Sequence, residues 1–242
     1  MTTLRLLMTK RARRPPLATK AVAPAPNVVP RWCFVALGIV IIFFSLIRVR
    51  LLNLPLERDE GEYAYAGQLM LQGIPPYHLA YNMKLPGTYA AYSLIMGVFG
   101  QTPTGIHVGL LVVNAATVFL IFLLAVRLFG PVAGLAAGSS YALLSTSESV
   151  LGFAGHATHF VVLAALGGIL VLLKAIENQR MVFYFASGLL LGLSFVCKQP
   201  GIFFVLFGGF FVIMSEWRRG TDWRALARRV AVFSAGTAIP FA

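Results

Sequence analysis

Residues 105–126 read GIHVGLLVVNAATVFLIFLLAV, a stretch that contains no Asp, Glu, Lys or Arg. A helix needs about 20 consecutive apolar residues to cross the hydrocarbon layer of a bilayer. Comparable apolar runs occupy most of the remaining chain, at 32–47, 131–147, 157–173, 181–197 and 200–215. The sequence therefore predicts an all-α fold, a polytopic transmembrane helical bundle with about six spanning helices.

Composition and charge point the same way. Hydrophobic residues make up 58% of the 242 residues and charged residues 12%, whereas soluble domains carry about 25% charged residues. The net charge of +12 comes largely from two basic clusters, at 5–31 and 218–229, which flank apolar runs. Lys and Arg at such positions remain on the cytoplasmic side of a membrane. We therefore expect a multi-pass protein of the plasma (inner) membrane with a cytoplasmic N-terminus and no nucleic-acid partner.

The chain is expected to divide into a basic, flexible cytoplasmic tail at 1–31 and one membrane domain at 32–242. Residues 32–47 are expected to be an uncleaved anchor, because Arg48-Val49-Arg50 follow where a cleavage site would need small residues. The first outer loop then covers 53–104. An apolar run begins near Val230 and reaches the last residue, so we expect the domain to be truncated.

Two segments of the first outer loop are predicted to be interfacial helices, 60–72 and 86–99. The second is apolar but short for a membrane span. If 86–99 lies at the outer surface, Arg127, Lys174 and the arginines of 218–229 all face the cytoplasm. If it spans, they all face outward. The positive-inside bias favours the surface position.

Half of the eight acidic residues lie within six positions after the first apolar run, at Glu57, Asp59, Glu60 and Glu62. Such a cluster could bind a divalent metal, act as a general base or stabilise an oxocarbenium-like centre. A purely structural interpretation is also open, because Asp59 and Glu62 have the spacing of a helix N-cap and its reciprocal N3 acid.

Several basic side chains are expected near the same outer face. Lys84 could meet a lipid phosphate or extend to the interface as a snorkelling lysine. His156 and His159 share one helical face, where polar or phosphate contacts are favoured over a metal site. Lys198 interrupts apolar residues, and a charge there is costly unless it serves a site. Arg48 and Arg50 could pair with Glu57 or a phosphate, or snorkel.

The order of these residues resembles the C-superfamily membrane glycosyltransferases, in the branch of protein O-mannosyltransferases and aminoarabinose lipid A transferases. The resemblance covers about 32–215 and corresponds to the N-terminal half of such enzymes. It rests on an ordered set of short motifs: Asp59-Glu60 with Tyr63 and Ala66, Gly73-Ile74-Pro75-Pro76-Tyr77, Lys84-x-Pro86 with Tyr89, Phe99-Gly100, Arg127-Leu128-Phe129-Gly130 and Lys198-Gln199-Pro200.

The resemblance implies an inverting glycosyltransferase that moves a sugar from a polyprenyl-phosphate-linked donor to an acceptor hydroxyl at the outer face. Asp59 matches the catalytic carboxylate of the family, and Glu60 would assist in positioning. Lys84 would contact the lipid phosphate and stabilise the leaving group. The remaining residues expected to bind substrate are Tyr63, His156, His159, Lys198 and Gln199. Membrane lipid is a further expected partner, and no metal ligand set is assigned, although a divalent metal stays open.

Two departures from the family pattern bear on this prediction. Lys84-Leu85-Pro86-Gly87 stands where Lys-Pro-Pro is frequent, and Gly155-His156-Ala157-Thr158-His159 lacks the acid of the usual Thr-Pro-Asp. The two histidines are candidate substitutes for that acid. Two other function classes stay open, a lipid-sugar transporter or flippase and a non-catalytic membrane scaffold. Transporters tend to have internal repeats and ionisable groups near the midplane, whereas this sequence has no internal repeat and no acidic residue in mid-span.

Overall fold

The computed structural model describes residues 29–242, apart from the side chain of Glu148, and the described chain is helical without strands. The all-α prediction is confirmed. Most of the predicted 1–31 tail lies outside the described residues. The helices, in chain order, are α1 (Arg31–Val49), α2 (Arg58–Leu71), α3 (Gly87–Phe99), α4 (Pro103–Phe129), α5 (Pro131–Leu144), α6 (Ala157–Asn178), α7 (Met181–Cys197), α8 (Ile202–Arg218) and α9 (Trp223–Ala238), with short 3-10 turns at Glu148–Val150, Gln199–Gly201 and Ile239–Phe241.

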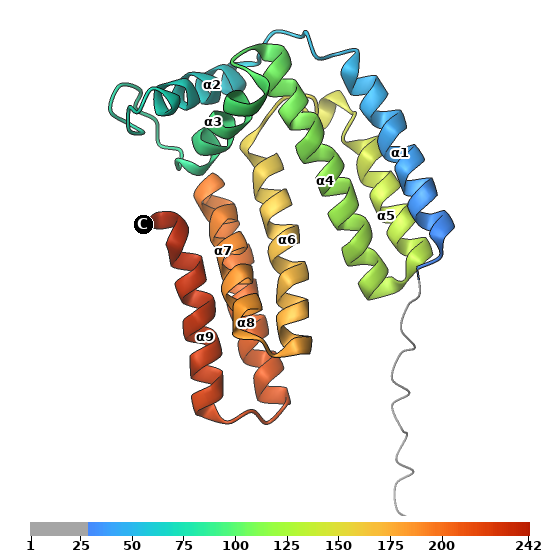
Figure 1. Cartoon of the computed structure of the whole chain (residues 1–242), viewed down its shortest axis with the longest axis vertical. Coiled ribbons are helices and arrows are strands. Elements are labelled where there is room, and N and C mark those ends of the chain that lie inside the picture. Colours follow the sequence, from blue (N-terminus) through green and yellow to red (C-terminus); the bar gives the residue numbers. More distant parts are fainter. Residues whose placement is uncertain (1–28) are drawn as a thin grey trace, which may run out of the picture.

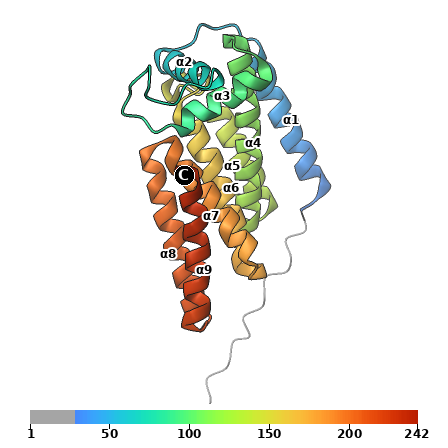
Figure 2. The same ribbon diagram turned by 60° about the vertical axis from the view of Figure 1, so that its left-hand side comes forward.

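Seven helices stand roughly side by side, whereas α2 and α3 lie across one end of them (Figure 1, Figure 2). We call that end the cap end. By length and composition, α1, α4, α6 and the segment Gln199–Arg218 can cross a membrane. The shorter apolar helices α5 and α7 run alongside them. These six correspond to the six apolar runs of the sequence.

The upright helices alternate in direction, so the turns that carry basic residues share the end opposite the cap (Figure 1). The turns α4–α5, α6–α7 and α8–α9 lie there together with the start of α1. Arg127, Arg180 and Arg218 belong to these turns or adjoin them. The acidic cluster lies at the cap end, at the start of α2. The basic turns and the acidic cluster at the start of α2 thus lie at opposite ends of the bundle.

Segment 50–102 leaves and re-enters the bundle at the cap end. Asn53, just after α1, accepts a hydrogen bond from the hydroxyl of Thr104 at 2.8 Å, and the carbonyl of Leu52 lies 2.9 Å from Nδ1 of His107. The end of α1 and the start of α4 are therefore neighbours. This geometry agrees with the expectation that 86–99 does not span.

Arg48 ties α1 to the loop between α5 and α6. Its guanidinium is buried and donates hydrogen bonds to the carbonyls of Gly152 at 2.7 Å and Ser145 at 2.9 Å. It also lies over the ring of Phe153. The expected pairing with Glu57 or a phosphate, and the snorkelling alternative, are therefore replaced by a structural role. Burying these two guanidinium nitrogens is tolerable because backbone carbonyls accept their hydrogen bonds, whereas Nε has no partner among the described residues.

Close packing between helices depends on glycines that the sequence places four residues apart. Gly134 and Gly138 on α5 face Val126, Phe122 and Val118 on α4, and Gly188 and Gly192 on α7 face the backbone of α9. Small residues at such positions let helix backbones approach closely. The two pairs therefore fix the α4–α5 and α7–α9 contacts.

We expect Gly188→Ala to destabilise the bundle by about 1–3 kcal/mol, because overpacking a close contact displaces backbone. An added Cβ would overlap the carbonyl oxygen of Phe233 on α9. Thermal unfolding in detergent measures the effect. Gly38→Ala in α1 is the matched control, since a Cβ there meets no heavy atom within 4 Å. Equal melting temperatures for the two variants would contradict the packing argument.

Candidate functional site

The acidic cluster forms the first turn of α2, and a capping box holds it in place. The Glu57 side chain accepts a hydrogen bond from the backbone N–H of Asp59 at 2.8 Å, and Glu60 accepts one from the N–H of Glu57 at 3.0 Å. The N-cap is therefore Glu57 and its N3 partner is Glu60, two residues earlier than the Asp59–Glu62 pair that the spacing suggested. This correction leaves the side chains of Asp59 and Glu62 out of the capping box.

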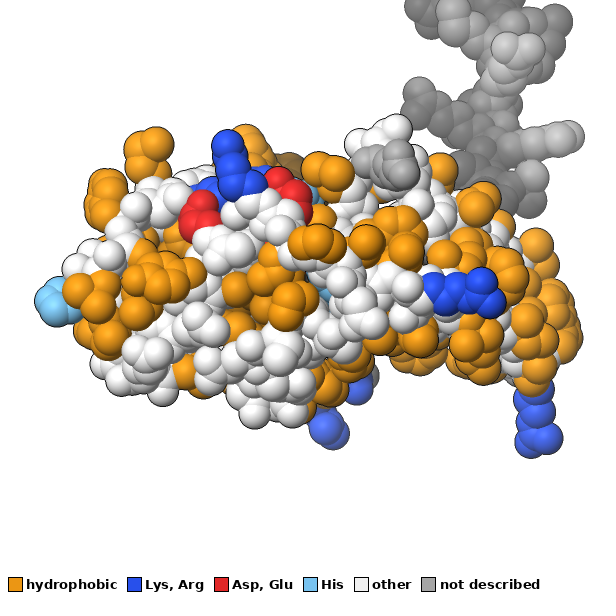
Figure 3. Space-filling view, turned by 90° about the horizontal axis from the view of Figure 1, so that it is seen from above, with side chains coloured by type: hydrophobic (Ala, Val, Ile, Leu, Met, Phe, Trp, Pro, Cys, Tyr) orange, Lys and Arg blue, Asp and Glu red, His pale blue; other side chains and the backbone are white. Residues whose placement is uncertain are grey.

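Asp59 and Glu62 instead face Lys84 from the loop before α3. The ammonium nitrogen of Lys84 lies 3.5 Å from Oδ2 of Asp59 and 3.1 Å from Oε2 of Glu62. The exposed fractions of the three side chains are 25% for Asp59, 32% for Glu62 and 33% for Lys84. In the end-on view, visible acidic side chains gather beside basic ones (Figure 3). The group is thus pre-organised but open to a ligand.

Tyrosines surround this group. Lys84 lies over the ring of Tyr63 at 4.6 Å, and the hydroxyl of Tyr89 donates to Oε1 of Glu62 at 3.2 Å. The hydroxyl of Tyr77 donates to the carbonyl of Lys84 at 2.7 Å. Burial acts to lower the pKa of Lys84, but hydrogen bonds to Glu62 and Tyr63 outweigh it and raise that pKa. Lys84 therefore stays cationic at neutral pH.

Glu60 points away from this open group and into the protein. Its side chain is 1% exposed, and its Oε1 accepts a hydrogen bond from the N–H of Gly155 at 2.5 Å and lies 3.4 Å from Nε2 of His107. Burial acts to raise the pKa of Glu60, but the hydrogen bonds from His107, Glu57 and Gly155 outweigh it and lower that pKa. Glu60 is therefore an ionised, buried link between α2, α4 and the loop that joins α5 to α6, which we call the second loop.

The depressed pKa of Glu60 predicts a pH-dependent contribution to stability. This stabilisation is fully present above the pKa of about 4.3 that Glu60 has in the unfolded chain. It is lost as the pH falls through the lower pKa that Glu60 has in the folded protein. We expect Glu60→Gln to cost about 2 kcal/mol at pH 7, because hydrogen bonds to a charged acceptor are lost. The difference from wild type should shrink as the pH falls below about 4. Thermal unfolding at pH 7 and at lower pH measures this difference, and one that grew on acidification would contradict it.

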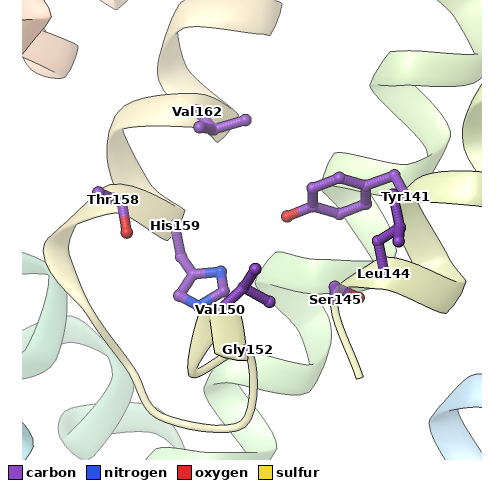
Figure 4. A pocket seen from close by; sticks show the side chains of 8 residues that line it. All are labelled: Tyr141, Leu144, Ser145, Val150, Gly152, Thr158, His159 and Val162. Carbon is purple, nitrogen blue, oxygen red and sulfur yellow. The ribbon is translucent and has the colours of Figure 1, made fainter. Parts of the chain in front are cut away.

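The two predicted histidines at the start of α6 diverge. Nδ1 of His156 lies 3.9 Å from Oδ2 of Asp59, so His156 joins the carboxylate group. His159 instead lines a cavity of about 270 Å³ between α5 and α6. Figure 4 shows its ring on one side of that space and the hydroxyl of Tyr141 directed into it from α5. The expectation that His156 and His159 serve one site is therefore wrong, because the two side chains line different places.

Lys198 and Gln199 lie at the cap end, where α7 finishes beside the loop before α3. The Gln199 amide donates to the carbonyl of Met83 at 3.1 Å, and the hydroxyl of Thr88 donates to the carbonyl of Cys197 at 2.8 Å. The side chain of Lys198 is exposed. It is therefore not buried among apolar residues, and Gln199 fixes the loop that carries Lys84.

Three of these side chains could hold a cation. Ligand atoms of Glu57, Asp59 and His156 lie within 4.8 Å of one another. Carboxylate oxygens and an imidazole nitrogen suit several divalent metals. The Lys84 ammonium already lies 3.5 Å from Asp59, so a metal there would compete with an existing positive charge.

The sequence reasoning missed three residues that the structure places around the carboxylates. His107 contacts Glu60, and the hydroxyl of Tyr92 donates to the carbonyl of Gly155 at 2.7 Å. A signal for His107 existed, because a polar side chain within an apolar run of a membrane protein indicates a functional or paired position. Gly155 and Tyr92 carried no such signal.

A family described as dolichyl-phosphate-mannose-protein mannosyltransferase matches residues 84–239, more than half of the chain. The chain belongs to this family. No individual curated protein and no solved structure matches it.

The chain is thus a membrane glycosyltransferase of the mannosyltransferase family, as the motif order predicted. The match begins at Lys84 and includes His156, His159, Lys198 and Gln199. It leaves out the first turn of α2, including Asp59. Membership in this mannosyltransferase family therefore supports glycosyl transfer, and the match assigns nothing to Asp59.

Proposed function

We propose that the protein transfers a sugar from a polyprenyl-phosphate-linked donor to an acceptor hydroxyl, with inversion at the anomeric carbon and with Asp59 as the catalytic carboxylate. The observation that carries this proposal is the open group of Asp59, Lys84 and His156, with distances of 3.5 and 3.9 Å from Asp59. It combines a carboxylate with an ammonium group and an imidazole inside a family of glycosyltransferases.

The chemistry assigned to these residues is a single displacement. Asp59 accepts the proton of the acceptor hydroxyl while the acceptor oxygen bonds to the anomeric carbon. The bond from that carbon to the phosphate oxygen of the donor breaks, and its electron pair stays on the phosphate. Lys84 stabilises this negative charge, and attack from the face opposite the leaving phosphate inverts the configuration.

We further propose that the site faces the outer side of a plasma (inner) membrane. The position of the basic turns at the end opposite the candidate site supports this orientation, because basic loops remain in the cytoplasm. The site would then lie at the level of the lipid head groups. A lipid-linked donor reaches that level without leaving the membrane.

The donor class and the stereochemistry can be tested in membranes that contain the protein. We expect transfer from a polyprenyl-phosphate sugar and none from the corresponding nucleotide sugar. NMR of the product is expected to show the anomeric configuration opposite to that of the donor. Transfer from the nucleotide sugar alone would contradict the donor assignment, and retention would contradict direct displacement.

A further inference from the structure

The second loop, which carries His156, is held at one residue from two sides. The N–H of Gly155 donates to Oε1 of Glu60 at 2.5 Å, and its carbonyl accepts from the hydroxyl of Tyr92 at 2.7 Å. Both side chains are buried, with exposed fractions of 1% and 0%. A Cβ on Gly155 would overlap the Tyr92 hydroxyl and lie 3.1 Å from Glu60 Oε1. A larger residue at position 155 would therefore displace the Tyr92 hydroxyl.

Each partner of Gly155 is itself fixed by another element. His107 at the start of α4 places Nε2 3.4 Å from Glu60 Oε1, while its Nδ1 lies 2.9 Å from the carbonyl of Leu52. The ring of Tyr92 packs edge-on against Tyr63 and Phe160. We call the contacts of Glu60, Tyr92 and His107 around Gly155 the clamp. The clamp joins α2, α3 and α4 to the start of α6.

The next residue after Gly155 is His156, whose Nδ1 lies 3.9 Å from Asp59 Oδ2. Asp59 is the residue before Glu60 in the same helical turn. Asp59 is therefore the chain neighbour of Glu60, and His156 is the chain neighbour of Gly155. A displacement of Gly155 or of Glu60 would therefore move one member of that contact.

We propose that Tyr92 and His107 are positioning residues, which act through Gly155 and Glu60 to hold His156 beside Asp59. This inference rests on the proposed function of Asp59. Neither residue is placed in contact with substrate. They affect transfer through the relative position of Asp59 and His156. Misplacement of a reacting group by about 1 Å can cost a hundredfold in rate.

Tyr92→Phe is the cleanest variant, because it removes one hydroxyl and keeps the ring contacts. We expect it to lower kcat about tenfold to a hundredfold with little change in KM. Tyr65→Phe is the matched control, since Tyr65 is on α2 in the same outer segment and its side chain is exposed. Equal kcat values for the two variants would overturn the role of Tyr92.

A double-mutant cycle separates positioning from a general loss of stability. If the clamp acts through His156, the effects of Tyr92→Phe and His156→Gln on kcat should be strongly non-additive. The same cycle with His107→Gln in place of Tyr92→Phe should give the same result. Additive effects on kcat that follow the loss of melting temperature would overturn the proposal.

A measurement without substrate distinguishes failure of this inference from failure of the proposed function. The chain has four histidines, and His156→Gln assigns the His156 signal in a spectrum of nitrogen-15-labelled side chains. Tyr92→Phe is expected to shift that signal and Tyr65→Phe is not. An unshifted signal would overturn the clamp even in an active enzyme. A shifted signal in a protein that transfers no sugar would support the clamp and leave only the function contradicted.

Discussion

Replacing Asp59 with asparagine is expected to lower sugar transfer by about 10²–10⁴-fold, the contribution typical of general acid–base catalysis. Asparagine keeps the size of the side chain but cannot accept a proton. The N-cap bond at this helix start uses the Glu57 side chain and the backbone of residue 59, so it survives the change. Transfer from a polyprenyl-phosphate sugar in membranes, at equal expression, measures the effect.

The matched control for this variant is Asp222→Asn at the opposite end of the bundle. Asp222 caps α9 through a hydrogen bond from the N–H of Arg224 at 3.2 Å, and asparagine is an equally good N-cap. We expect this control to transfer sugar at the wild-type rate. Normal transfer by Asp59→Asn, or a loss that follows its melting temperature alone, would remove Asp59 from the chemistry.

The largest expected effect on stability comes from Glu216, far from the candidate site. Its side chain is fully buried and accepts hydrogen bonds from Tyr184 and Thr221 at 2.7 Å, from Gln179 at 3.2 Å and from Arg229. It therefore joins the turn after α6 to α7, α8 and α9. Glu216→Leu is expected to lower stability by about 3–5 kcal/mol, because it leaves Arg229, whose side chain is only 13% exposed, without its ion-pair partner.

Two further variants test that explanation by thermal unfolding in detergent. The double change Glu216→Leu with Arg229→Leu is expected to be less destabilising than Glu216→Leu alone, since it removes the unpaired charge as well. Glu177→Leu should cost less than about 1 kcal/mol, because Glu177 is 63% exposed in its ion pair with Arg127. A double variant as unstable as the single one would show that lost packing causes the effect.

The sequence by itself determined the helical architecture of the bundle. The apolar runs that predicted helices at 105–126 and 157–173 lie within α4 and α6. Such runs are read correctly from sequence because the length and polarity of a span are local properties, set by bilayer thickness and by the need to pair every backbone group within the helix. The motif order likewise predicted the family that the comparison identified. The clustering of carboxylates after the first span is a local property too.

Only the tertiary structure decided what each of those carboxylates contacts. Spacing suggested Asp59 as the cap, whereas Glu57 is the N-cap and Asp59 faces Lys84. Glu60 is buried, and the N–H of Gly155, 95 positions away in sequence, donates a hydrogen bond to it. Arg48 donates hydrogen bonds to the carbonyls of Ser145 and Gly152, which are 97 and 104 positions away in sequence. These assignments depend on distances of about 3 Å between segments remote in sequence, which arise from helix packing and leave no periodic signal along the chain.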